Sequence, residues 1–207
     1  MTKIIVPFRD HDRIKKIAED FLKKYHPGSS CPIPIEEIIE FKLKLDIIPL
    51  PGLHKTFEID GFLAADRMSI SVDEGVYQSR PGRYRFTLAH EVGHFILHKE
   101  LYDERRFKST GEWKDFVSQF PEKEYAWFEW QAYEFAGLIL VPGHHLEKRF
   151  RHHVKQLKDL GIRSENVILY RAAELLAKDF LVSPEVIQRR LDREGCAKDI
   201  LDRVITL

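Results

Sequence analysis

Two histidines and a glutamate interrupt an apolar run at residues 86–98, FTLAHEVGHFILH. His90 and His94 are four residues apart, so on a helix their imidazoles project from one face and could bind a single metal ion. Glu91 lies beside them, where a carboxylate suits a base that acts on metal-bound water. Polar groups are costly to bury without such partners. The run therefore predicts a metal centre on an otherwise apolar helix.

The pattern alone is only moderately specific. With 10 histidines and 19 glutamates in 207 residues, chance places His-Glu-x-x-His somewhere in the chain with a probability of roughly 0.04. Its position in a buried helix favours the metal site. Gly93, between the two histidines, leaves room for a second helix to approach.

A catalytic zinc ion needs a third protein ligand and an open fourth position. The best downstream candidate is Glu129 in EWQAYEFAG, because Ala132 and Ala136 follow on the same helical face and could pack against Gly93. The alternative is that Glu129 is an ordinary exposed acid. Glu134 projects to the opposite side. Two histidines and one carboxylate also suit iron or manganese, so the spacing does not fix the metal.

The other histidines are weaker candidates. His98 extends the stripe, but it lies about 9 Å of axial rise from the midpoint of the other two, so we expect it to cap the helix or to pack. Adjacent histidines face different ways on a helix, and we expect the pairs at 144–145 and 152–153 at the surface. His144 or His145, just after Pro142, could still reach a cleft.

Apolar spacing and breaker residues outline the elements that must position this site. Helices are expected over 9–25, from near Ile35 to before Pro49, and over 84–98, 124–140, 144–159, 165–179 and from Ser183 onward. Residues 57–72 predict two or three short antiparallel strands. Residues 99–122 read as an irregular excursion, typical of a lid or binding loop, whose Trp113, Phe116 and Phe120 dock onto the body.

These elements predict an α+β fold, with a small antiparallel sheet beside a mainly helical body that carries the metal site on two packed helices. The simplest division is a core over 1–143, with the N-terminal helices and the sheet, and a helical C-terminal lobe over 144–207, packed together as one domain.

Composition excludes several classes of function. The chain has 33 basic and 33 acidic residues, so no overall charge attracts nucleic acid or anionic lipid. Cys31 and Cys196 are far apart, which argues against a disulfide scaffold or a thiolate metal site and indicates reduced, structural thiols. No signal peptide or membrane-length apolar run occurs, so we expect a cytoplasmic protein without membrane contact.

Two motifs in order, RFTLAHEVGHFILH at 85–98 and EWQAYEFAGLILVP at 129–142, resemble the ImmA/IrrE family of zinc metallopeptidases. The likeness covers about three quarters of the chain. It implies a gluzincin-like site with His90 and His94 as zinc ligands, Glu91 as general base and Glu129 as third ligand. The family usually has Asn or Asp four residues after the ligand Glu. This chain has Tyr133, which could bond a ligand, polarise the scissile carbonyl or simply pack.

The resemblance also implies a function. Family members cleave a partner protein, commonly a helix-turn-helix repressor, and thereby switch transcription. We expect a zinc-dependent intracellular endopeptidase that makes a specific regulatory cleavage. In this hypothesis zinc activates a water molecule, Glu91 takes its proton, and the substrate adds as a strand to the edge of the 57–72 sheet.

Two rival interpretations stay open. Residues 168–193 read as helix, turn, helix, and Gln188, Arg189, Arg190 and Arg193 form a plausible groove-facing set for a transcriptional module. Against DNA binding by this chain, residues 144–207 hold 13 basic and 10 acidic residues, a surplus of only three. The other rival is a domain with a structural or vestigial metal site that sequesters its partner. The intact Glu91 argues against it, since a structural site needs no base.

Overall fold

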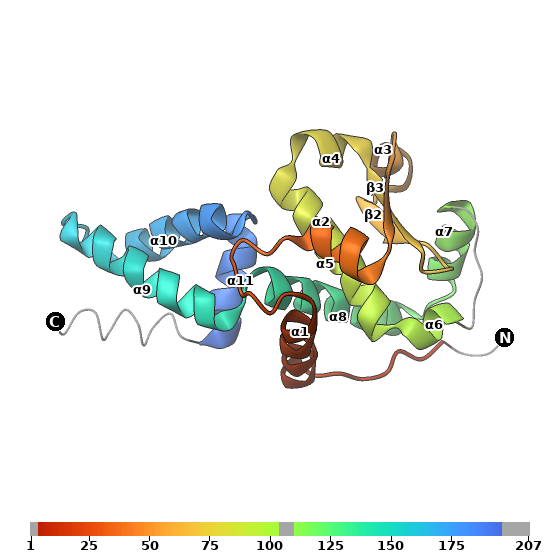
Figure 1. Cartoon of the computed structure of the whole chain (residues 1–207), viewed down its shortest axis with the longest axis horizontal. Coiled ribbons are helices and arrows are strands. Elements are labelled where there is room, and N and C mark those ends of the chain that lie inside the picture. The colour runs from red at the N-terminus through yellow and green to blue at the C-terminus, as the bar shows by residue number, and fades with distance from the viewer. Residues whose placement is uncertain (1–3, 104–109, 196–207) are drawn as a thin grey trace.

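Two long helices, α5 (Pro81–Leu97) and α8 (Glu122–Leu140), pack against each other at the centre of the computed structural model, which describes residues 4–103 and 110–195 (Figure 1). A Cβ at Gly93 would lie 2.9 Å from both the Cα and the carbonyl oxygen of Ala132. Because no real Cβ fits at that distance, glycine is what lets the two backbones approach. The expected contact between Gly93 and the alanine stripe is confirmed.

Both central helices lie close to their predicted bounds, 84–98 and 124–140, but α5 begins three residues earlier and α8 two residues earlier. Pro81 occupies the first turn of α5, where its missing N–H is not needed. Helix α8 starts directly after Pro121 and stops before Pro142. Its buried side chains include Phe128, Ala132 and Phe135, which recur at helical spacing.

The sheet has three strands, β1 (Asp46–Leu50), β2 (Gly61–Leu63) and β3 (Ser69–Asp73), in the order β1-β3-β2. Strands β2 and β3 are antiparallel, as the 57–72 pattern predicts. Strand β1 runs parallel to β3, with Ile47 opposite Ile70. The sheet is therefore mixed, and the expectation of a purely antiparallel sheet is wrong.

The extra strand replaces part of an expected helix. Helix α2 (Ile35–Glu37) continues into the π-helical segment η1 (Ile38–Leu43), and the chain then reverses at Lys44, whose φ is +61°. The β-branched pair Ile47–Ile48 favours an extended backbone. Pro49 is tolerated because β1 is an edge strand, where one N–H need not pair. Short helices α3 (Leu53–Phe57) and α4 (Glu74–Ser79) flank the strands.

The N-terminal helix α1 (His11–Tyr25) packs on α8. Asp10 caps it by accepting a hydrogen bond from the backbone N–H of Arg13. Its buried residues Ile14, Ala18 and Phe21 share one face, and the Phe21 ring meets Phe135 of α8 edge-on at 5.5 Å.

Where the structure describes them, residues 99–122 are more helical than the sequence predicts. They include α6 (Lys99–Asp103) and α7 (Thr110–Ser118), while residues 104–109 of the expected excursion lie outside the described part of the chain. Trp113, Phe116 and Phe120 are buried, as expected, and the Trp113 ring lies 5.7 Å from that of Phe62 on β2. Helix α7 therefore packs over the β2 end of the sheet.

The C-terminal lobe consists of α9 (Gly143–Asp159), α10 (Glu165–Phe180) and α11 (Pro184–Glu194), close to the predicted bounds. It lies at the opposite end of the molecule from the sheet (Figure 1). The α+β fold class is confirmed, while the division at residue 143 stays a prediction. None of the helices in the described ranges is long and apolar enough to cross a membrane.

Candidate metal centre

Helices α5 and α8 bring together the three residues that the sequence predicts as ligands. The Nε2 atoms of His90 and His94 lie 3.0 Å apart. The Glu129 carboxylate lies 3.1 Å from Nε2 of His90 and 3.6 Å from Nε2 of His94. Glu129 reaches them because it is one turn before Ala132, the point of closest helix approach.

This donor set fits a zinc ion. All three ligand atoms lie within 4.8 Å of one another, and tetrahedral donors at about 2.0–2.1 Å from zinc are about 3.4 Å apart. Two imidazoles and one carboxylate leave a fourth position for water or substrate. The same set also suits iron or manganese.

Electrostatics at the cluster follow from burial and from the carboxylate. Burial disfavours a charged His90, but the hydrogen bond and negative charge of Glu129 outweigh it and raise the pKa of His90. Burial, with His90 and His98 nearby, holds the pKa of His94 well below its usual value. His94 is therefore neutral at neutral pH, which is the state a metal requires.

Glu91 is buried beside the ligands, with 5% of its surface exposed. Burial raises its pKa to about 7; the charge of Glu129 acts in the same direction, while His90 and the backbone N–H of Leu63 oppose it. A carboxyl with this pKa can both accept and donate a proton near neutral pH.

His98 contacts Nδ1 of the candidate ligand His94, the ring nitrogen that does not face Glu129. Its Nδ1 lies 3.0 Å from Nδ1 of His94, on the ring edge away from Glu129. Such contacts fix the orientation of a ligating imidazole. His98 is almost fully buried against the Phe128 ring, and burial lowers its pKa to about 3. It packs, and it is also the C-cap residue of α5, so both roles expected for it are confirmed.

A cavity of about 140 Å³, here called the metal pocket, opens on this cluster and contains residues that sequence reasoning missed. Tyr125 lines it and hydrogen-bonds Glu129. The signal for Tyr125 was its position, one helical turn before Glu129. Tyr102 of α6 also lines the pocket, but it belongs to a segment whose pattern predicted no helix.

Gly61, the first residue of β2, and the two residues before it line one wall of the metal pocket. A Cβ at Gly61 would lie 2.7 Å from both the Ser71 carbonyl oxygen and Cγ2 of Thr87 on α5. Glycine therefore lets the strand approach the helix that carries the histidines. Its neighbour Asp60 also lines the pocket and is held by ion pairs to Arg83 and His54.

Tyr133 lies elsewhere. Its ring packs against Phe86, with centroids 4.7 Å apart, and the Arg189 guanidinium of α11 lies 4.8 Å above it. It does not line the metal pocket. Of the three roles considered for Tyr133, this position supports packing, because one further turn along α8 directs the side chain toward α11.

Of the predicted groove-facing set on α11, Gln188, Arg189 and Arg193 are exposed, while Arg190 is buried. Arg190 is 3% exposed and bonds Glu194 and the Val141 carbonyl oxygen, so its expected exposure is wrong. Arg189 covers Tyr133, and Arg193 lies 3.8 Å from Glu134. Helix α11 thus directs its arginines onto α8.

Two other expectations concern surface groups. The expected surface placement is confirmed for His144 and His152, which are exposed, while His145 and His153 are half-buried and bond the Ser29 carbonyl oxygen and Asp179 respectively. Cys31 is a free thiol, and burial raises its pKa. Cys196 lies outside the described residues.

Comparison with known proteins agrees with this fold and site. The model of the IrrE N-terminal-like domain, the peptidase M78 family, matches residues 63–192, more than half of the chain. The chain therefore belongs to this family, and the resemblance drawn from the two motifs is confirmed.

A solved structure described as a Mycobacterium tuberculosis transcriptional regulator has a similar fold, with a TM-score of 0.56 and 16% sequence identity. The alignment covers 88% of this chain and 56% of that one, so this chain spans little more than half of the regulator. No curated protein matches the chain.

Proposed function

We propose that this protein is a zinc-dependent endopeptidase that makes a specific cleavage in a partner protein. The observation that carries the proposal is the convergence of His90, His94 and Glu129 beside a buried carboxyl, Glu91, at a pocket bounded by a strand edge. Membership of the peptidase M78 family supports the same reaction class.

His90, His94 and Glu129 would hold the metal, which when bound supplies a Lewis acid that polarises a carbonyl and makes water a stronger acid. His98 keeps the His94 imidazole in its ligating orientation through the 3.0 Å contact between their Nδ1 atoms. Tyr125 does the same for the Glu129 carboxylate.

Glu91 moves the proton. As a carboxylate it accepts a proton from the attacking water, and as a carboxylic acid it gives that proton to the departing amine. Its pKa of about 7 in the metal-free protein shows how readily this buried site accepts a proton.

The substrate backbone would bind along β2. This strand pairs with β3 on one side only, and its other side, at Gly61, faces the metal pocket. Main-chain hydrogen bonds to such an edge give affinity without sequence preference, and side-chain pockets then select the sequence. A pocket of about 140 Å³ suits an extended segment better than a folded one.

We further propose that the partner is a helix-turn-helix repressor and that its cleavage takes place in the cytoplasm. The family resemblance supports this choice of substrate, and the balanced charge of the chain fits a peptidase that does not itself bind DNA.

The test uses the conservative variant Glu91→Gln. Zinc-loaded wild type and variant are incubated with a peptide library of defined composition, and new N-termini are identified by mass spectrometry. The wild type should generate cleavages at a restricted set of sequences. The variant should retain zinc and lose at least about 100-fold in rate, the usual contribution of a general base. Equal cleavage by both proteins would contradict the role of Glu91, and no cleavage by either would contradict the peptidase.

A further inference from the structure

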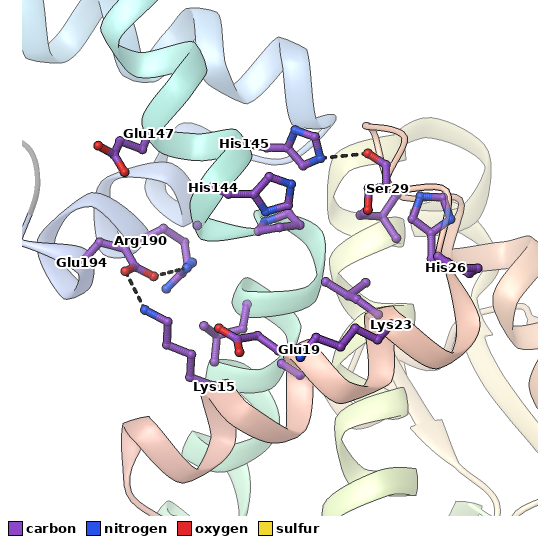
Figure 2. Close-up of a pocket in the computed structure, with 17 residues that line it drawn as sticks. Lys15, Glu19, Lys23, His26, Ser29, His144, His145, Glu147, Arg190 and Glu194 are labelled. Carbon is purple, nitrogen blue, oxygen red and sulfur yellow. Dashed lines mark hydrogen bonds and ion pairs between the residues drawn. The ribbon is translucent and has the colours of Figure 1, made fainter.

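A second cavity, of about 700 Å³, lies where α1, the loop after it, and the ends of α8, α9 and α11 meet (Figure 2). We call it the α1–α9 cavity. It shares no lining residue with the metal pocket, and the proposed peptidase mechanism does not use it. Its volume is within the range of about 300–1,000 Å³ typical of small-molecule sites.

One end of this cavity is lined by a cluster of three charged side chains, of which Arg190 is buried and Lys15 and Glu194 are half-buried. Glu194 bonds Lys15 at 2.8 Å and Arg190 at 2.6 Å, and Figure 2 shows all three side chains meeting at the cavity. Although burial opposes it, the two cations hold the pKa of Glu194 below its usual value, so the carboxylate stays charged. Two cations against one carboxylate leave a net positive charge at this end.

The Arg190 guanidinium uses only some of its N–H donors within the described structure. Its Nε donates to the Val141 carbonyl oxygen and its Nη2 to Glu194. Its Nη1 is buried and finds no hydrogen-bond partner within residues 4–103 and 110–195. A buried N–H donor without an acceptor costs free energy, and an acceptor on a bound ligand would remove that cost.

The N-terminus of α9 adds to the same end. Its N-cap residue is Pro142, whose side chain accepts no hydrogen bond, and the helix then begins with Gly143. A Cβ at Gly143 would lie 3.3 Å from a carboxylate oxygen of Glu194, so the glycine lets this carboxylate approach the helix end. Helix N-termini favour negative charge.

The rest of the α1–α9 cavity combines apolar surface with a few charged side chains. Ala18, Leu22, Ile33 and Leu138 contribute apolar surface. Among the remaining charged lining residues, Lys23 lies 3.7 Å from Asp20, Glu147 is paired with Arg151 at 2.6 Å, and Glu19 adds one negative charge on α1. The positive end therefore faces apolar walls.

From these features we propose that the α1–α9 cavity binds a small amphipathic anion, a molecule with a carboxylate or phosphate group on a short apolar body. The anionic group would accept from Arg190 Nη1 and from Lys15 beside the α9 N-terminus. The apolar body would lie along Leu22, Ile33 and Leu138.

A set of matched probes tests the proposal on the full chain. Hexyl phosphate, hexanol and hexylammonium have the same apolar body and carry an anion, no charge and a cation. Binding is followed by ligand-observed NMR titration. Hexyl phosphate should bind saturably at millimolar concentration, as expected for a fragment of this size, and should bind more tightly than either analogue.

Two lysines on α1 provide the matched variants. Lys15→Met removes a cavity cation whose side chain is 35% exposed, so the fold should tolerate the change. Lys16→Met removes an exposed neighbour that does not line the cavity. Loss of one charge-assisted hydrogen bond predicts about tenfold weaker binding of hexyl phosphate to Lys15→Met. Lys16→Met should bind as the wild type does.

A third variant, Leu22→Trp, fills the cavity from its half-buried wall and should abolish binding of hexyl phosphate. Thermal melts without probe confirm that each variant is folded. The proposal is overturned if hexyl phosphate does not saturate, if hexanol binds equally well, or if Lys16→Met weakens binding as much as Lys15→Met does.

Discussion

The metal pocket and the Lys15–Glu194–Arg190 cluster both group buried and half-buried ionisable side chains, but their charges are balanced in different ways. In the second cluster the Glu194 carboxylate is paired with two cations of the protein itself, Lys15 and Arg190. In the first, two imidazoles and the Glu129 carboxylate converge on a common point, and among the described residues no lysine or arginine lines the pocket. Of the two clusters, the one whose metal-ligating atoms are not paired with a lysine or arginine is the one expected to bind a metal ion.

The two clusters should differ most in how their contribution to the free energy of unfolding depends on pH. The pKa of Glu91 is raised to about 7 in the folded, metal-free protein. The native state therefore binds the proton more tightly than the unfolded state, and stability present at low pH is lost as the pH rises toward 7. From about pH 4.5 to about pH 7 this one group should lower the unfolding free energy by about 3 kcal/mol.

Denaturant unfolding of metal-free protein across that pH range measures the effect. The variant Glu91→Gln should flatten the slope. An unchanged slope in the variant would show that another group titrates there.

Breaking the Lys15–Glu194–Arg190 cluster should lower the free energy of unfolding by nearly as much. Arg190→Met leaves Glu194 buried with only Lys15, and we expect a loss of about 2–3 kcal/mol. Lys15→Met, which removes a half-exposed partner, should cost less than about 1 kcal/mol. Urea unfolding of the two variants compares them directly, and equal losses would argue against the central position of Arg190.

The helix contact that assembles the metal pocket can be tested with one methyl group. Gly93→Ala places a Cβ against the backbone of Ala132, and we expect a loss of about 1–2 kcal/mol despite the better helix propensity of alanine. Gly28→Ala is the control, because a Cβ there meets nothing within 4 Å. If both variants unfold alike, the close approach of α5 and α8 is not needed.

The sequence predicted the site best where the functional residues recur at helical spacing on one face of a helix. The spacing of His90 and His94 and the alanine stripe after Glu129 depend on local geometry alone, so the central helix pair could be predicted. Strand β1 could not, because its partner β3 is distant in sequence and the preceding residues have a helical pattern. The helical segments in residues 99–122 were missed for lack of periodicity.

The burial of the long Arg190 side chain also could not be predicted from the sequence. Arg190 falls beside the core positions of α11, and exposure was the natural expectation for an arginine. Its stem is buried because Gly137 of α8 leaves space, with a Cβ there only 3.3 Å from Cδ of Arg190. That complementarity joins two helices and cannot be read from either one.

Zinc content tests the central claim most directly. Wild type, Glu129→Ala and the control Glu122→Ala, an exposed acid on the same helix, are reconstituted with zinc, dialysed and analysed for metal per chain. The three-ligand centre predicts near-stoichiometric zinc in wild type and control and a sharp fall in Glu129→Ala. Absence of zinc from the wild type, or equal zinc in all three proteins, would contradict it.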